Sequence, residues 1–495
     1  MYRNNFYSFN VRREEENRWI LRTSLPCAMD SVGAITYGKN EFQWGDRLFK
    51  LEHVFVLART CPTQANIFIY TFSLDTGASG TWETFQLGIP YNQLGHGASI
   101  TFRPTNYIYW DPTLWCYVIT LGELYFTQGN MTGNFYCLPI KQLFSPVVCD
   151  TAIACDWVFP PDNGVLDAMK IFFRWETIPN ANYYYLQVDK NPDFSSPILD
   201  ITTDKNIYNS KKIFSPGVYY WRICSDVSPI WDSAKKFQII GPVIRKRAVP
   251  ESLGVGGSIA YHRFKMREQD TTYAESIYCL IGGSRQRPRK HFYCYSVHKD
   301  SWFMVDSTRI GQKVGASLTS CYQGRHPYWK KRLLATLAPR DPDGTLPHHR
   351  IYHVPENEWY PSEDPIPHEL GAGASITFDW EREDPYLVIG GGENNFLVYH
   401  RSSDEEEDSL TEGGQSLITN KIVFFYSSEK PSYGEISIYN LYGKKIKTLF
   451  RGKMEKKEYQ LIWDKKDEKK FSPGIYFLII NTKEKKERIK IIITH

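Results

Sequence analysis

One six-residue pattern recurs along this chain and constrains its fold more than any other feature. The residues Gly-Ala-Ser-Ile-Thr-Phe stand at 97–102 and again at 373–378, and looser versions stand at 33–37, 256–261 and 315–318. Short β-branched and aromatic runs follow the copies, separated by glycine or polar loops, which is typical of successive short β-strands. The recurrence predicts a set of similar small sheets.

The stretch from Gly254 to Asp306 shows the complete unit. It predicts four antiparallel strands within 254–261, 276–283, 291–297 and 301–305. Equivalent positions lie 65 residues apart from Ala34 to Ser99, and 59 and 58 apart from Ser258 to Ser317 and from Ser317 to Ser375. The interval from Ser99 to Ser258 is 159 residues, which leaves room for an inserted small domain of about 100 residues.

These residues resemble the kelch family of β-propellers over roughly Asn4 to Arg401, without the insert. The matching features are the double glycine after the second strand (Gly282-Gly283), an aromatic residue on the third strand (Tyr293, Tyr352, Phe396) and a tryptophan on the fourth (Trp82, Trp302, Trp359). The resemblance implies one ring in which the strands of Ser99, Ser258, Ser317 and Ser375 lie nearest the hub. Tryptophan would then fill the wedge between neighbouring sheets.

The chain begins with what looks like the outer half of a sheet, at 5–11 and at Arg18–Arg22. Three strands at 375–399 lack a following Trp strand, and we expect the Trp19 strand to supply it. This would close a ring of about five blades and leave no exposed sheet edge. The alternative is a start truncated within a longer parent of six blades.

The insert resembles bacterial fibronectin type III domains. Its strands alternate over 172–176, 181–188 and 216–223, as in a β-sandwich. The resemblance implies that Trp175 and Tyr185 pack in the core, that 220–222 form a late strand, and that Trp231 with 237–239 marks the closing strand. Such domains serve as spacers or binding surfaces.

The last 75 residues resemble the C-terminal sorting domain of the bacterial type IX secretion route. An Ile-Ser-Ile-Tyr run at 436–439, Trp463-Asp464, Pro-Gly-Ile-Tyr at 473–476 and a final lysine-hydrophobic strand at 490–493 follow in the family's order. The resemblance implies a small β-sandwich, a secreted or surface-attached protein, and the secretion machinery as partner. No signal peptide is visible at the start, although that route begins with export through the inner membrane.

The predicted organisation is therefore all-β: a kelch-like β-propeller and two β-sandwich domains. The predicted domains are propeller at 1–149, inserted domain at 150–245, propeller at 246–400, acidic linker at 401–420 and sorting domain at 421–495. The linker is too polar to form a core.

Composition limits the functions to consider. Lys421–His495 holds 18 Lys and Arg against 9 Asp and Glu, so this segment carries a charge of about +9. The net charge of the whole chain is +4, so the rest of the chain is acidic, which disfavours nucleic acid as a partner. No apolar run approaches the ~18 residues of a membrane helix. Ten cysteines stand singly, so we favour free buried thiols, although a disulfide such as Cys149 with Cys155 is open.

No catalytic or metal-binding pattern emerges. Copper radical oxidases resemble this architecture, but His349 and His353 flank one strand at opposite ends, so we predict no metal and no cofactor. The most suggestive exposed group is a basic loop in the complete unit, with Arg285, Arg287, Arg289 and Lys290. A basic face built from loops could bind an anionic glycan or an acidic protein patch.

We therefore expect a monomeric, secreted or cell-surface, non-catalytic binding protein with a protein or glycan ligand. The alternative is a carbohydrate-active enzyme, oxidase-like or sialidase-like, on the same scaffold.

Overall fold

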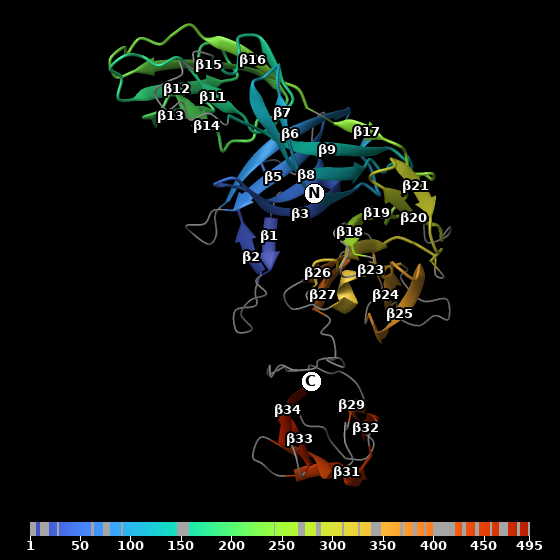
Figure 1. Cartoon of the computed structure of the whole chain (residues 1–495). Helices are drawn as coiled ribbons and strands as arrows, with labels where there is room; N and C mark the ends of the chain where they lie inside the picture. The colour runs from blue at the N-terminus through green and yellow to red at the C-terminus, as the bar shows by residue number, and fades with distance from the viewer. Residues whose placement is uncertain are drawn as a thin grey trace. The chain divides into compact units, whose positions relative to one another are not determined.

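The computed structural model describes most of the chain between Phe6 and Ile493 (Figure 1). The described residues are 6–9, 19–26, 29–60, 64–72, 80–90, 93–145, 158–241, 243–265, 273–283, 289–308, 311–324, 327–337, 348–366, 370–371, 373–379, 384–390, 393–398, 421–427, 432–440, 445–455, 458–464, 474–482 and 486–493. Their regular elements are β-strands, as the sequence predicts, apart from one single-turn helix, α1 (Pro327–Lys330). They fall into two units, 1–398 and 399–495.

Five antiparallel sheets recur in the first unit. Sheet 1 is β3 (Met29–Trp44), β4 (Arg47–Thr60), β5 (Gln64–Phe72) and β6 (Gly80–Pro90). Sheet 2 is β7 (Ser99–Asp111), β8 (Cys116–Thr127), β9 (Phe135–Phe144) and β17 (Ile244–Lys246). Sheet 3 is β18 (Ser258–Phe264), β19 (Ala274–Leu280), β20 (Phe292–Ser296) and β21 (Ser301–Met304). Sheet 4 is β22 (Ser317–Ser320), β23 (Arg332–Thr336), β24 (His348–His353) and β25 (Glu358–Pro365). Sheet 5 is β26 (Ser375–Asp379), β27 (Asp384–Gly390) and β28 (Glu393–Val398).

Each repeat of the six-residue pattern lies at or near the start of the first strand of a sheet, and successive first strands contact one another. β3 contacts β7, β7 contacts β18, β18 contacts β22 and β22 contacts β26. Buried side chains fill the spaces between sheets 1 and 2, between 2 and 3, and between 3 and 4. Tryptophans of the fourth strands pack there as predicted: Trp302 lies 5.1 Å from Phe135 of sheet 2, and Trp359 lies 4.9 Å from Phe292 of sheet 3.

Sheet 2 is assembled from two separate parts of the chain. Its fourth strand, β17, pairs with β9 but follows the insert. The insert contains a five-stranded sheet and a two-stranded sheet around one core. The larger is β10 (Gly164–Leu166), β16 (Lys235–Ile239), β15 (Gly217–Ser225), β12 (Tyr184–Asp189) and β13 (Leu199–Thr203), and the smaller is β11 (Phe172–Arg174) with β14 (Ile207–Asn209).

The structure corrects one core assignment in the insert. Trp175 is buried as expected, but Tyr185 is 37% exposed, and Tyr184 packs against Trp175 at 5.6 Å instead. Successive side chains of a strand point to opposite faces of the sheet. Leu186 and Val188 on β12 face the core of the insert, and Tyr184 lies on the same face. Three consecutive tyrosines hide this register in the sequence, because a shift of one residue exchanges the two faces.

The N-terminal strands also differ from expectation. β1 (Phe6–Phe9) and β2 (Trp19–Arg22) pair with each other in a separate two-stranded sheet, and sheet 5 contains three strands in the described residues. The Trp19 strand therefore does not complete sheet 5. The sequence could show that a Trp strand was available, but not which edge it would join.

The second unit consists of two sheets. β29 (Lys421–Ser427) pairs with β32 (Glu458–Asp464), and four strands run in the order β31 (Lys445–Met454), β30 (Ser432–Asn440), β33 (Gly474–Thr482), β34 (Lys486–Ile493). Ile436, Ile438, Leu478 and Ile480 are buried on the two central strands.

Some predictions fall beyond the described residues. The acidic linker, Cys149 and Cys155 lie outside them. Within them, six cysteines are free, and no helix is long and apolar enough to cross a membrane.

Candidate functional site

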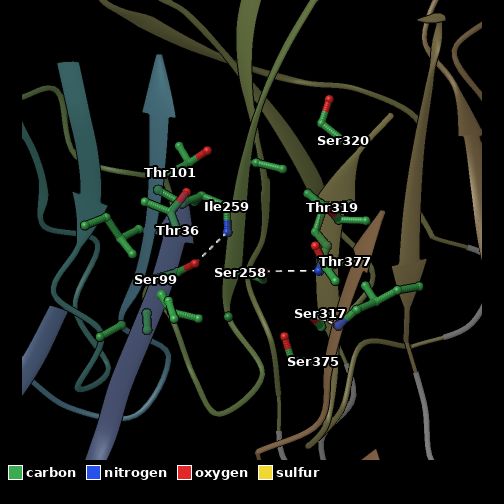
Figure 2. Close-up of a pocket in the computed structure, with 18 of the residues that line it drawn as sticks. Thr36, Ser99, Thr101, Ser258, Ile259, Ser317, Thr319, Ser320, Ser375 and Thr377 are labelled. Carbon is green, nitrogen blue, oxygen red and sulfur yellow. Dashed lines mark hydrogen bonds between the residues drawn. The ribbon is translucent and has the colours of Figure 1, made fainter. Parts of the chain in front are cut away.

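The first strands of all five sheets line one cavity of about 990 Å³ (Figure 2). Ser99, Ser258, Ser317 and Ser375, the repeated serines, all lie on its wall. The glycine two residues before each serine adopts a positive φ, between +79° and +88°, which glycine tolerates without strain. The repeated glycine therefore forms the turn that precedes the cavity-lining part of each strand.

Serine hydroxyls connect successive first strands. The backbone N–H of Ile259 donates to Ser99 Oγ, that of Leu318 to Ser258 Oγ, and that of Ile376 to Ser317 Oγ, each at 3.1 Å (Figure 2). The N–H of Tyr261 likewise donates to Thr101 Oγ1 at 2.9 Å. Because neighbouring sheets share no backbone ladder, these bonds fix the alignment of the strands around the cavity.

Other hydroxyls on the wall are not used in this way. Within the described part of the chain, Thr36 on β3 and Thr319 on β22 form no hydrogen bond to a neighbouring sheet, and both side chains are partly exposed. Aromatic rings of Tyr322 and Phe378 stand on the same wall. The described lining includes Lys39 and His96 but no Asp, Glu, Arg or Cys. The site is thus rich in hydroxyls and rings and poor in charge.

Two tyrosines of the wall are held by carboxylates beside the cavity. Tyr37 donates to Glu52 Oε1 at 2.6 Å, and Tyr261 donates to Glu275 Oε1 at 2.6 Å. Burial, reinforced by the neighbouring carboxylate, raises the pKa of both phenols, so they stay protonated at neutral pH. They act as hydrogen-bond donors rather than as bases.

A buried histidine supports the wall from behind. His262 Nδ1 lies 2.8 Å from Ser320 Oγ, its ring contacts Tyr278 and Tyr322, and its Nε2 has no partner among the described residues. Burial lowers the pKa of His262 to about 3. Burial, together with the charge of Lys170, lowers the pKa of His53 on β4 to about 4. Both imidazoles are neutral in the folded protein at neutral pH.

Acid should therefore destabilise the protein before its carboxylates titrate. The unfolded state binds a proton at each histidine below about pH 6.5, but the folded state does not, so stability is present above pH 6.5 and lost as pH falls toward the folded pKa. From pH 7.5 to 5.0 we expect each histidine to cost about 2 kcal/mol of unfolding free energy. Urea unfolding of wild type and His262→Gln at the two pH values measures this.

The amide of His262→Gln retains a polar group near Ser320 but cannot titrate. The comparison at pH 7.5 isolates any packing change, because His262 is neutral in both states there. An unchanged pH dependence in the variant would contradict the assignment of His262 as a buried neutral group.

The predicted basic loop is only partly described. Arg285 and Arg287 lie outside the described residues. The Arg289 guanidinium turns back onto the chain, where it contacts the Ser252 carbonyl oxygen and lies 3.4 Å from Ser252 Oγ, whereas Lys290 is exposed. Arg289 thus anchors a loop, and neither it nor Lys290 lines the cavity.

The histidines considered for a metal also have definite places. His349 is buried at one end of β24, and His353 at the other end lies 3.0 Å from Glu356 Oε2. Among the described residues, no three His, Cys, Asp or Glu side chains are grouped as metal ligands.

Sequence reasoning missed the cavity hydroxyls as candidate site residues. The sequence shows these Ser and Thr residues as part of the repeated six-residue pattern, but the pattern by itself predicts only β-strands. Their convergence depends on five strands from distant parts of the chain, which composition and spacing do not show.

Comparison with known proteins identifies the second unit. The family model described as "Secretion system C-terminal sorting domain" matches residues 419–494. A search of curated proteins found no match. Among solved structures, the chain is similar to a "Novel fungal alcohol oxidase with catalytic diversity among the AA5 family, in complex with copper", with 8% identity and a TM-score of 0.24 over 99% of this chain and 81% of that one. A likeness that weak carries no functional argument. The sorting domain, by contrast, marks proteins exported by type IX secretion, and this protein is therefore delivered to the cell surface or the extracellular space.

Proposed function

We propose that the five sheets form a kelch-type β-propeller around the cavity, and that β10 to β16 form a fibronectin type III-like spacer within it. The succession of first-strand contacts, the single cavity that they all line and the tryptophans between sheets support this architecture. The two-sheet core of the insert supports the second part.

On this scaffold the protein acts as a non-catalytic binding protein for a neutral glycan. The observation that carries the proposal is the cavity lining, which combines Ser, Thr and Tyr side chains with the aromatic rings of Tyr322 and Phe378. Hydroxyls both donate and accept hydrogen bonds, which suits the hydroxyl groups of a sugar, and aromatic faces pack against its apolar C–H surfaces. The scarcity of charge on the described wall favours a neutral ligand over an anionic one. Export to the surface brings the cavity into contact with extracellular glycans.

Removal of unused cavity hydroxyls should weaken binding without weakening the fold. Thr36→Val and Thr319→Val preserve side-chain shape and remove one hydroxyl each, and neither hydroxyl joins two sheets. We expect each variant to bind the captured glycan about fivefold more weakly, the effect of one lost neutral hydrogen bond. Binding of the full-length protein to a glycan array identifies the glycan, and titration calorimetry then measures the loss.

A matched control is Thr202→Val, an exposed threonine on β13 of the insert, which should leave affinity unchanged. Failure of the array to show any neutral glycan, or turnover of the bound glycan into a product, would contradict the proposal.

The basic loop is proposed as a second contact. Arg285 and Arg287 would add affinity for anionic groups on the same ligand or on an acidic protein. Arg285→Ala with Arg287→Ala, included in the same array, should reduce binding to sulfated or carboxylated glycans and leave neutral glycans unaffected.

A further inference from the structure

Two departures from the repeated pattern meet in the seam between sheets 3 and 4, where β18 contacts β22. Two residues after the repeated serine (Ala34 in sheet 1), the other four sheets carry a threonine, but sheet 3 carries Ala260. One residue further, the other four sheets carry an aromatic residue, but sheet 4 carries Ser320. The threonines are Thr36, Thr101, Thr319 and Thr377, and the aromatic residues are Tyr37, Phe102, Tyr261 and Phe378. Ala260 and Ser320 both line the cavity, and Figure 2 shows Ser320 on its wall.

The first departure leaves the backbone N–H of Ser320 without an acceptor. The N–H of Cys321 donates to β23, and N–H groups alternate in direction along an antiparallel strand, so the N–H of Ser320 faces away from β23. The equivalent N–H of Tyr261 donates to Thr101 Oγ1 at 2.9 Å. Ala260 has no hydroxyl to offer Ser320 in the same place, and this N–H forms no hydrogen bond within the described part of the chain.

A buried imidazole sets the direction of the Ser320 hydroxyl. His262 Nδ1 lies 2.8 Å from Ser320 Oγ, and His262 Nε2 has no partner among the described residues. His262 is 1% exposed, and a proton on Nε2 would be a buried donor without an acceptor, so the proton belongs on Nδ1. The Nδ1–H then donates to Ser320 Oγ, and the serine keeps its own O–H for a ligand in the cavity.

Apolar surface lies beside these two donors. Ala260 presents a methyl group where the other sheets present a threonine, and the ring of Tyr322 stands on the same wall. Edge contacts fix the Tyr322 ring, whose centroid lies 5.5 Å from that of Tyr261 and 6.3 Å from that of His262. The seam thus offers two hydrogen-bond donors and an apolar surface to one small group.

An acetamido group matches both parts of this arrangement. Its carbonyl oxygen accepts hydrogen bonds, and its methyl group is apolar. A sugar hydroxyl can accept the same hydrogen bonds, but it brings no methyl group for Ala260 and Tyr322. A carboxylate would suit the donors and the Arg263 guanidinium, which lies 5.4 Å from the Tyr322 ring, but it would place its charge against the apolar surface.

We propose that the seam between sheets 3 and 4 recognises the acetamido group of an N-acetylated amino sugar. The carbonyl oxygen accepts from the Ser320 N–H and from the Ser320 O–H, and the methyl group packs on Ala260 and Tyr322. This inference rests on the proposed function, because it names the class of neutral sugar that the cavity binds.

A glycan array of matched pairs tests the assignment. The members of each pair differ only in an acetamido or a hydroxyl group on the second sugar carbon, as in tetraacetylchitotetraose and cellotetraose. We expect the full-length protein to bind the acetylated member of its best pair about tenfold more tightly, because that member gains neutral hydrogen bonds and a buried methyl group. Titration calorimetry with both members measures this preference.

Ala260→Thr restores the hydroxyl that the other sheets carry. Its oxygen should accept from the Ser320 N–H, as Thr101 Oγ1 accepts from Tyr261, so the preference should fall to about twofold. The thermal midpoint should stay the same or rise, because the seam gains a hydrogen bond. Ser320→Ala adds no volume and provides a second test if Ala260→Thr unfolds the protein, and it should reduce the preference about threefold.

Thr319→Val is the matched control. It removes a hydroxyl from the same strand, but side chains of neighbouring strand residues point to opposite faces, so Thr319 does not face the seam between sheets 3 and 4. This variant should weaken binding to both members of a pair and leave the ratio of their affinities unchanged.

The outcomes separate this inference from the proposed function. Binding to no glycan on the array would contradict both together. Equal binding to both members of every pair, or tighter binding to a carboxylated glycan than to an acetylated one, would overturn the inference alone. A folded Ala260→Thr or Ser320→Ala protein that keeps the full preference would overturn it as well.

Discussion

Replacement of Arg103 by Met is expected to lower the free energy of unfolding by about 3 kcal/mol, since the variant leaves two partly buried carboxylates without their cation. Arg103 on β7 is only 4% exposed at its side chain. Its Nη1 lies 2.8 Å from Glu123 Oε2 of the same sheet, and its Nη2 lies 2.5 Å from Glu275 Oε2 of sheet 3. The guanidinium therefore holds two sheets together through charge-assisted hydrogen bonds.

The pKa of Glu275 shows how strongly the site depends on Arg103. Burial would raise the pKa of this carboxyl, yet hydrogen bonds from Arg103 and Tyr261 outweigh burial and leave the pKa below its ordinary value. Without Arg103 the pKa should rise, because burial then acts with less opposition. The deficit of Arg103→Met measured by urea unfolding should accordingly be smaller at pH 5 than at pH 7.5.

An exposed ion pair provides the control for Arg103. Lys50 Nζ lies 3.1 Å from Glu41 Oε2, with side chains 60% and 46% exposed, so Lys50→Met should change stability by less than about 0.5 kcal/mol. The double variant Arg103→Met with Glu275→Gln should recover part of the loss. An Arg103→Met protein as stable as wild type at pH 7.5 would show that the network contributes no net stability.

Gly97→Ala is the second large effect, with an expected loss of about 3 kcal/mol. Two costs combine at this position. The φ of +86° strains any residue with a Cβ, and the added carbon would lie 2.2 Å from the backbone oxygen of Gly254, which cannot move independently of sheet 3. Thermal and urea unfolding of the full-length protein measure the loss.

Gly373→Ala separates the two costs. Its φ of +85° is nearly the same, but an added Cβ meets nothing within 4 Å. We expect a loss of only about 1 kcal/mol, from backbone strain alone. Equal losses in the two variants would mean that the contact between the added Cβ and Gly254 adds nothing to the cost of backbone strain at Gly97.

Much of the local structure could be predicted from the amino-acid sequence. The four strands of sheet 3 lie where the runs between Gly254 and Asp306 predict them, because β-branched and aromatic residues bounded by glycine form strands in almost any context. The tail was identifiable for a different reason: its Ile-Ser-Ile-Tyr, Trp-Asp and Pro-Gly-Ile-Tyr residues follow in a fixed order, and the family model over 419–494 confirms that order.

The misplaced residues share a physical cause. Tyr185 was assigned to the core and Trp19 to the last sheet, and in both cases the residue type was suitable but the partner was wrong. A tyrosine fits either face of a strand, and a Trp strand can pair with any compatible edge. Such choices are made by the neighbours, through burial and hydrogen bonding that the local sequence does not contain.

The repeated glycine and serine residues thus predict a series of similar sheets from the sequence alone. A positive φ and the start of a strand are properties of a few adjacent residues. Ser99 and Ser317 each join two strands, whereas Ser375 joins none among the described residues, and the difference depends on which strand lies beside each hydroxyl. That neighbour comes from about 60 to 160 residues away along the chain, and only packing in three dimensions brings it there.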